Sequence, residues 1–230
     1  MAQAAQAHAD QVWAAVRPCV DVAGAAPLVC RSGCSWCCHQ LVAVLPAEVI
    51  AIVRYVERTF APDARAVLMR RLSALDARAR GLSPLERARL KQPCAFLVDG
   101  ACSIHAARPL RCRGVHSRDA DHCRWAFEHP DEAAASRRTR ARPGPYAVES
   151  AEIAHAALTG LARACRETGL DHDMLELNAA ARIALNVPDA ELYALNADPI
   201  FAAAELPDAA AETAARHSGN AASADIDLGP

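Results

Sequence analysis

Apolar residues recur at helical spacing over most of the chain, which predicts a mainly α fold. An alanine-rich stretch at 2–22 predicts the first helix. A second helix is predicted to begin at Pro46, because proline suits the first helical position, and a third to follow Pro62 and end at Gly81. Ser83 begins the next helix, since the run Ser-Pro-Leu-Glu is a capping box with proline in its first turn.

The remainder of the chain alternates short elements and loops. Two short extended pieces flank an Asp-Gly turn within 95–102, which predicts a very short β-hairpin. A short helix is predicted at 119–128 and a longer one at 147–168, with Asp171 capping a further helix. The intervening stretch 130–145 holds four arginines beside two prolines and predicts a connecting loop.

Composition limits how these elements can pack. The 230 residues are 53% hydrophobic but only 4% aromatic, so the core must be helical and rich in small side chains. We expect a single helical domain over 1–206 with a cysteine-cluster core at 30–123. Beyond it, 207–230 has almost no bulky apolar residue, which predicts a disordered tail.

Charge and hydropathy exclude several classes of partner. The net charge of -2 gives no general attraction to nucleic acid or to an anionic membrane. The sequence contains no run of about 18 apolar residues, so we expect no membrane-spanning segment. The chain does not start with a basic region followed by an apolar stretch, so we expect a cytoplasmic location with reduced thiols.

Eight of the ten cysteines fall into two bursts, and this density indicates metal ligation. Thiolates are strong, soft ligands for zinc and for iron–sulfur clusters, and short spacings lower the entropic cost of bringing several to one ion. The first burst is taken as four candidate ligands and the second as four more: Cys30, Cys34, Cys37 and Cys38, then Cys94, Cys102, Cys112 and Cys123. The predicted fold is therefore an irregular helical domain with a cysteine-rich metal-binding insert.

The division of these thiols among metal centres stays open. Cys34 and Cys37 have the common chelate spacing, whereas side chains of adjacent Cys37 and Cys38 tend to diverge. Either the first burst serves two centres, or one of the adjacent thiols is a spare reactive group. His39 and His105 offer imidazole alternatives. Five disulfides are also formally possible, although the adjacent pair and the absent signal segment argue against them.

Arginines close to the bursts predict countercharge for a thiolate centre. A zinc ion with four thiolates carries about two negative charges, which a buried site must compensate. Arg31, Arg108, Arg111 and Arg113 lie close enough in sequence to do so, with solvated surface arginines as the alternative. The two remaining cysteines, Cys19 and Cys165, lie on apolar helical stripes, so we expect them to be buried structural residues rather than ligands.

The order of these elements resembles the CxxCxxCC (YkgJ-like) family of zinc- or iron-chelating cysteine-cluster proteins. The chain departs from the strict spacing by having an arginine at position 31 and a cysteine at 30. The residues that carry the resemblance are Cys34-Ser35-Trp36-Cys37-Cys38, Cys94-Ala95-Phe96-Leu97, Gly100, Cys102, Ile104-His105, Arg108-Pro109 and Cys112-Arg113.

The resemblance implies binding of zinc or iron, with a four-iron cluster as one form, and it leaves three functions open. The first is a cytosolic metal-binding protein that holds zinc or an iron–sulfur cluster through both bursts. The second is a cluster-dependent enzyme, because the family includes a flagellin lysine N-methylase; the chain has no recognisable glycine-rich loop for S-adenosylmethionine. The third is an interaction module stapled by structural zinc, which would need only four of the cysteines.

Overall fold

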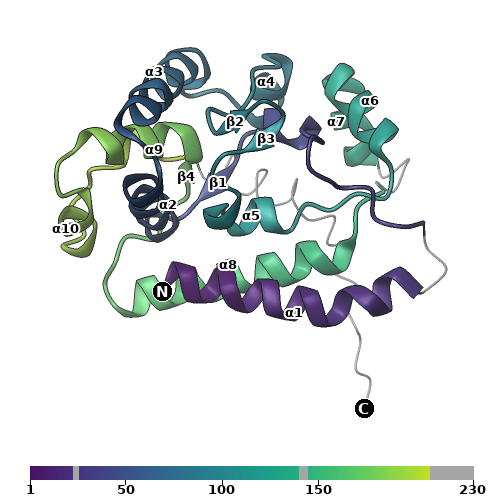
Figure 1. Ribbon diagram of the computed structural model, residues 1–230, viewed down its shortest axis with the longest axis horizontal. Helices are drawn as coiled ribbons and strands as arrows, with labels where there is room; N and C mark the ends of the chain where they lie inside the picture. The colour runs from purple at the N-terminus through teal and green to yellow at the C-terminus, as the bar shows by residue number, and fades with distance from the viewer. Residues whose placement is uncertain (23–25, 140–144, 208–230) are drawn as a thin grey trace.

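The computed structural model describes residues 1–22, 26–139 and 145–207, and their fold is mainly α (Figure 1). The long helices α1 (Ala2–Val22) and α8 (Val148–Glu167) run side by side along one edge. Helices α2 (Pro46–Thr59), α3 (Pro62–Ala79), α9 (Leu177–Asn186) and α10 (Ala190–Leu195) form one side of the molecule. Helices α6 (Ala120–Glu128) and α7 (Pro130–Thr139) form the other.

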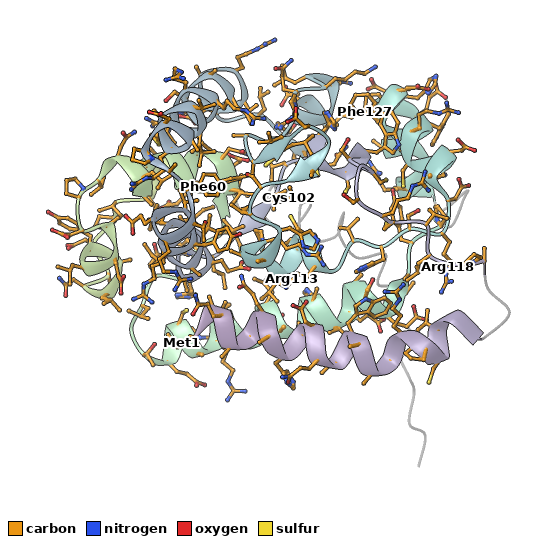
Figure 2. All side chains as sticks on the ribbon, viewed as in Figure 1. Met1, Phe60, Cys102, Arg113, Arg118 and Phe127 are labelled. Atoms are coloured by element: carbon orange, nitrogen blue, oxygen red, sulfur yellow. The ribbon has the colours of Figure 1, made fainter. Side chains whose placement is uncertain are left out.

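Between these two sides lie several short elements. They are η1 (Trp36–His39), α4 (Pro84–Arg89), η2 (His105–Ala107), α5 (Leu110–Arg113) and the hairpin of β2 (Leu97–Val98) with β3 (Ala101–Cys102). Of these, η1, β3 and α5 carry cysteines. A second antiparallel pair joins β1 (Ala43–Val44) to β4 (Leu175–Glu176), and η3 (Ala202–Ala204) follows near the end of the described chain. Figure 2 shows Cys102 in the middle of the molecule, between the sides labelled by Phe60 and Phe127.

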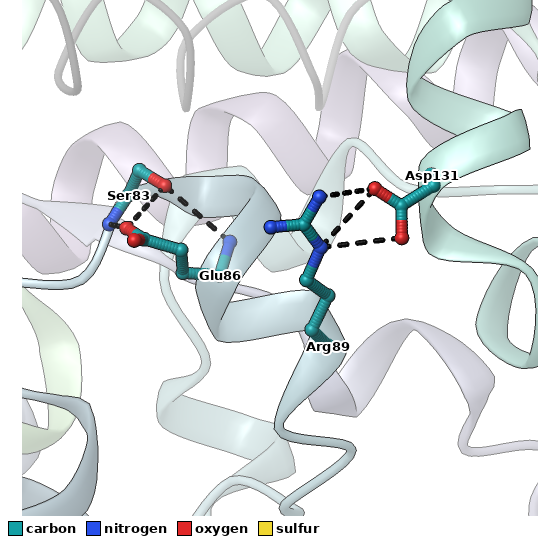
Figure 3. Close-up of polar contacts among 4 residues, drawn as sticks. All are labelled: Ser83, Glu86, Arg89 and Asp131. Atoms are coloured by element: carbon teal, nitrogen blue, oxygen red, sulfur yellow. Dashed lines mark hydrogen bonds and ion pairs between the residues drawn. The ribbon is translucent and has the colours of Figure 1, made fainter.

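Local sequence explains where the helices begin. Proline is the first residue of α2, α3, α4 and α7, where its missing N–H has no helical partner to lose. The predicted capping box of α4 is formed: the Ser83 backbone N donates to Glu86 at 2.8 Å, and the Glu86 backbone N donates to the Ser83 hydroxyl at 3.3 Å (Figure 3). The helix starts predicted from proline and serine are therefore confirmed.

Two apolar clusters hold the helices together. The larger one packs α2, α3 and α9 against residues that flank the hairpin, among them the fully buried Phe96 and Ile104. The smaller one packs α1 and α8 against Leu45 and Leu110. Cys94 belongs to the larger cluster, and Cys38 and Cys102 pack against it, so this cluster positions cysteines from both bursts.

Two sequence predictions for the second half of the chain are wrong. The predicted loop at 130–145 begins with helix α7, since Pro130 occupies its first position and two acidic residues follow in its first turn; 140–144 lie outside the described residues. Asp171 does not cap a helix but accepts a hydrogen bond from the Asp173 backbone N at 2.9 Å in a turn. The following chain first pairs as β4, and Glu176 then caps α9.

Of the two cysteines predicted to be structural, one is buried and one is not. Cys165 is buried in the smaller cluster, as expected, whereas Cys19 on α1 is exposed and does not belong to that cluster. From residue 208 onward, the predicted tail lies outside the described residues. No helix of the described chain has the length and apolar character to cross a membrane.

A close approach between α5 and α8 makes a glycine necessary. A Cβ at Gly114 would lie 2.7 Å from the Cβ of Ala154 and 3.2 Å from the Ser150 carbonyl oxygen. We expect Gly114→Ala to destabilise the fold by about 1–3 kcal/mol, the usual cost of overpacking. Urea unfolding measures this, with Gly160→Ala as the control, because Gly160 lies on α8 with open space around it. The control should be neutral or slightly stabilising, and equal behaviour of the two variants would contradict the prediction.

The buried carboxylate of Glu48 joins α2 to α5. Its Oε1 accepts the Leu110 backbone N–H at 2.8 Å and its Oε2 accepts the Leu45 backbone N–H at 3.2 Å. Burial raises the pKa of Glu48, while these hydrogen bonds and nearby Arg111 oppose the rise. In Glu48→Gln one N–H would face an amide NH₂, so we expect a loss of about 1–3 kcal/mol in unfolding free energy. The control is Glu57→Gln, at an exposed position on the same helix, which should leave the unfolding free energy unchanged. An equally small effect at Glu48 would contradict its proposed role in joining α2 to α5.

Candidate metal centre

Tight turns shape the first cysteine burst. The Cys34 backbone N donates to the Arg31 carbonyl at 3.0 Å, and the Cys38 backbone N donates to the Ser35 carbonyl at 2.9 Å. Within the first of these turns Gly33 has φ +86, which glycine adopts without strain. These turns place four thiols within one short surface segment rather than along an extended strand.

Backbone contacts join the two bursts directly. The Cys94 N–H donates to the Cys38 carbonyl at 2.7 Å, although the two residues are far apart in the chain. At the tip of the hairpin, a Cβ on Gly100 would lie 3.7 Å from the Cα of Gly33. The Ser117 backbone N donates to the sulfur of Cys30 at 3.2 Å. The sequence gap between the bursts is therefore closed by packing, as their shared chemistry predicts.

The predicted hairpin brings Cys102 back beside Cys94. Leu97 pairs with Cys102, and the turn residues Asp99 and Gly100 both have positive φ, +48 and +76. That conformation is typical of an Asp-Gly two-residue turn. Cys94 lies just before the first strand and is buried.

One group of thiols surrounds Cys112 at the inner side of the site. Burial raises the pKa of Cys112 well above its ordinary value, and neighbouring Cys94, Cys37 and Cys102 raise it further. Burial likewise raises the pKa of Cys94 to about 12. Burial is again the largest cause of the raised pKa of Cys102, and Cys37 raises this pKa further. Cys94, Cys102 and Cys112 therefore form one inner group, from which metal binding would have to displace protons.

A second group lies toward the surface around Cys123. Burial raises the pKa of Cys123, and the nearby thiols of Cys37, Cys30 and Cys34 add to the shift. Burial also raises the pKa of Cys30, again with contributions from Cys37 and Cys34. Cys37 therefore interacts with thiols of both groups, and its own pKa is raised first by a hydrogen bond with the adjacent Cys38 thiol and then by desolvation.

The thiols are gathered but are not arranged around an ion. Among the described residues, no three or more Cys, His, Asp or Glu side chains are positioned to hold a metal as they stand. All ten cysteines of the chain are free thiols. The donor set fits a soft metal, because it consists of clustered sulfur ligands with countercharge nearby. Metal uptake would have to release protons and reorient side chains.

The predicted arginine countercharges differ in what they face. Arg108 lies near the thiols and lowers the pKa of Cys30, Cys37, Cys102 and Cys112, although burial outweighs it at most of them. Its Nε is buried without a hydrogen-bond partner.

The three other arginines are directed elsewhere. Arg111 faces Glu48, and Arg113 forms an ion pair with Asp10 of α1 and donates to the Arg108 carbonyl at 2.9 Å. Arg31 is exposed and lines a shallow cavity of about 300 Å³ beside Cys34.

The two imidazole alternatives already have other contacts. His39 packs its ring on Phe127, with 4.6 Å between ring centroids, and its Nδ1 lies 3.2 Å from the Ser35 carbonyl oxygen. The guanidinium of Arg108 contacts the Nε2 of His105. Burial lowers the pKa of both imidazoles. The cysteine sulfurs therefore remain the candidate donors of this site.

Several residues that support the thiols escape prediction from sequence. The Oδ1 of Asn178 accepts the Ala95 backbone N–H at 3.0 Å and the Cys94 thiol at 3.4 Å, and this side chain is 1% exposed. The pKa of Tyr146 is raised, mainly by burial, and its hydroxyl is hydrogen-bonded to Cys123. A polar residue inside the apolar run that forms α9 is the one sequence feature that indicates Asn178.

Comparison with family models finds a family that the cysteine-rich segment matches. Residues 29–132 match the CxxCxxCC family model. The model is described as a "Putative zinc- or iron-chelating domain", and its bounds enclose both bursts. The match confirms the predicted resemblance over these residues, and the description of the family supports the predicted metal binding. Neither the curated proteins nor the solved structures yield a match.

Proposed function

We propose that this CxxCxxCC protein holds zinc or an iron–sulfur cluster through thiolates from both bursts. The observation that carries the proposal is the direct contact between the bursts, in which the Cys94 N–H donates to the Cys38 carbonyl at 2.7 Å and the Ser117 N–H donates to the sulfur of Cys30 at 3.2 Å. A redox, maturation or metal-handling role in a reducing cytoplasm would suit such a set of free thiols. The domain bounds 1–206, with the core at 30–123, stay a prediction.

The two thiol groups support two four-thiolate centres. The inner centre would consist of Cys94, Cys102, Cys112 and Cys38. The carbonyl of Cys38 accepts the Cys94 N–H, and its side chain packs on the larger apolar cluster. The outer centre would consist of Cys37 and the surface group, Cys30, Cys34 and Cys123. The adjacent thiols of Cys37 and Cys38, which are hydrogen-bonded to each other in the metal-free chain, would then serve different centres, which avoids the strain of binding one ion through adjacent residues.

Metal content tests the proposal directly. The full chain is purified under anaerobic conditions, and its metals and acid-labile sulfide are quantified. Two zinc ions, or two iron–sulfur clusters with broad visible absorption, would support two thiolate centres. A single zinc would favour a structural staple, and a chain that binds neither metal would contradict the proposal. A cluster would keep open the methyl-transfer activity known from the family.

A further inference from the structure

Arg87 on α4 connects the two cysteine bursts from the inside. It is 1% exposed and is the largest of the fully buried side chains. Its Nη1 donates to the His39 carbonyl at 3.0 Å and to the Gln92 carbonyl at 2.9 Å. His39 directly follows Cys38, and Gln92 lies two residues before Cys94. One nitrogen of this guanidinium therefore holds the ends of both bursts at a fixed separation.

The remaining guanidinium nitrogens lack hydrogen-bond partners. Nε and Nη2 of Arg87 are buried and make no hydrogen bond. The ionisable groups that interact with it include Glu176, Cys94 and the imidazole of His39. Glu176 is itself engaged, accepting the Ala179 backbone N–H at 2.8 Å and the Asn178 amide at 2.9 Å. A buried cation with unused donors is costly, so this environment suits additional negative charge close by.

We propose that Arg87 is a positioning residue of the metal centre, which braces both bursts and supplies the positive charge that stabilises Cys94 as a metal-bound thiolate. The inference rests on the proposed function, because it assigns Arg87 to a centre in which Cys94 is a ligand. A thiolate centre that has bound metal is anionic, which explains why a guanidinium with two unused nitrogens is buried beside the Cys94 segment.

The test separates charge from hydrogen bonding at one position. Arg87→Gln keeps a donor and removes the charge, Arg87→Lys keeps both, and Arg87→Met serves as a second neutral variant if Gln does not fold. The control is Arg89→Met on the same helix, which removes an exposed side chain that forms an ion pair with Asp131 (Figure 3). Reduced full-length apoprotein is titrated with Zn²⁺ and Co²⁺ against a competing chelator, and the Co²⁺–thiolate absorption is recorded.

We expect the neutral variants to bind both ions roughly 10–100-fold more weakly, as is usual when a supporting partner of a ligand is lost. Arg87→Lys and Arg89→Met should stay within about twofold of wild type, the limit expected for an uncoupled change. In a Cys94→Ser background, the effect of removing the charge should also fall below about twofold, because the thiolate is absent. A merely structural role would not change with the thiol at position 94.

Three results would overturn the inference. They are wild-type affinity in the neutral variants, an equal loss in Arg87→Lys, and an undiminished loss in the Cys94→Ser background. Failure of the underlying proposal is distinguishable, because wild-type protein would then bind neither Zn²⁺ nor Co²⁺. If the wild type binds them and the position-87 variants match Arg89→Met, only the role of Arg87 fails.

Discussion

Cys112→Ser is expected to remove most of the metal from its centre. Cys112 is the thiol that Cys94, Cys37 and Cys102 all approach, so it occupies the middle of the inner group. Serine keeps the size of the side chain, but its hydroxyl is a poor ligand for zinc and for iron–sulfur clusters compared with a thiolate. Elemental analysis of the variant purified beside wild type measures the effect. We expect the inner centre to retain less than about a tenth of its metal, since a ligand is lost outright.

Two cysteines in the same chain provide matched controls for this substitution. Cys165→Ser changes a buried thiol in the apolar cluster between α1 and α8, and Cys19→Ser changes an exposed thiol on α1. Both variants should retain wild-type metal content, although Cys165→Ser places a hydroxyl in an apolar environment and should lower the melting temperature. Full metal content in Cys112→Ser, or equal losses in the controls, would show that the inner thiols are not the ligands.

The sequence predicts elements well where one local rule decides the conformation. Proline in the first helical position marks α2, α3 and α4, and the Asp-Gly pair marks the hairpin turn. At α7 a local signal is outweighed in the prediction by the run of arginines, although Pro130 and the acidic residues after it favour a helix start. Elsewhere tertiary contacts decide. The pairing of β1 with β4 joins two-residue strands that are far apart in the chain, and no local sequence pattern predicts it.

The candidate site shows the same division between local and long-range information. The cysteines could be found from sequence, because their spacing itself indicates shared ligation. Their supports could not all be found in that way. Arg108 lies within the second burst and was predicted, whereas Arg87 and Asn178 lie outside both bursts and reach them only through packing. Proximity along the chain also misleads: Arg111, adjacent to Cys112, faces Glu48.

Metal removal is expected to loosen the cysteine-bearing segment far more than the helices around it. The hairpin strands are two residues long, and α5 has four residues, so neither element is stable by itself. Ligation therefore has to supply much of the order in 94–123, because metal that binds only the folded state adds its binding free energy to folding. Helices α2, α3 and α8, in contrast, bury apolar faces of their own.

Amide hydrogen exchange of the metal-loaded and chelator-treated protein tests this coupling. Exchange within 94–123 should accelerate by about tenfold or more without metal, which corresponds to at least about 1.4 kcal/mol of local stability. Phe96 and Ile104 belong to the larger apolar cluster, so the backbone near them should lose the least protection, and the backbone around Cys112 and Cys123 the most. Amides in α2 and α8 serve as the internal control and should exchange at nearly unchanged rates. Equal protection of 94–123 with and without metal would mean that the metal does not order this segment, and the thiols would then be better explained as a surface for transient metal transfer.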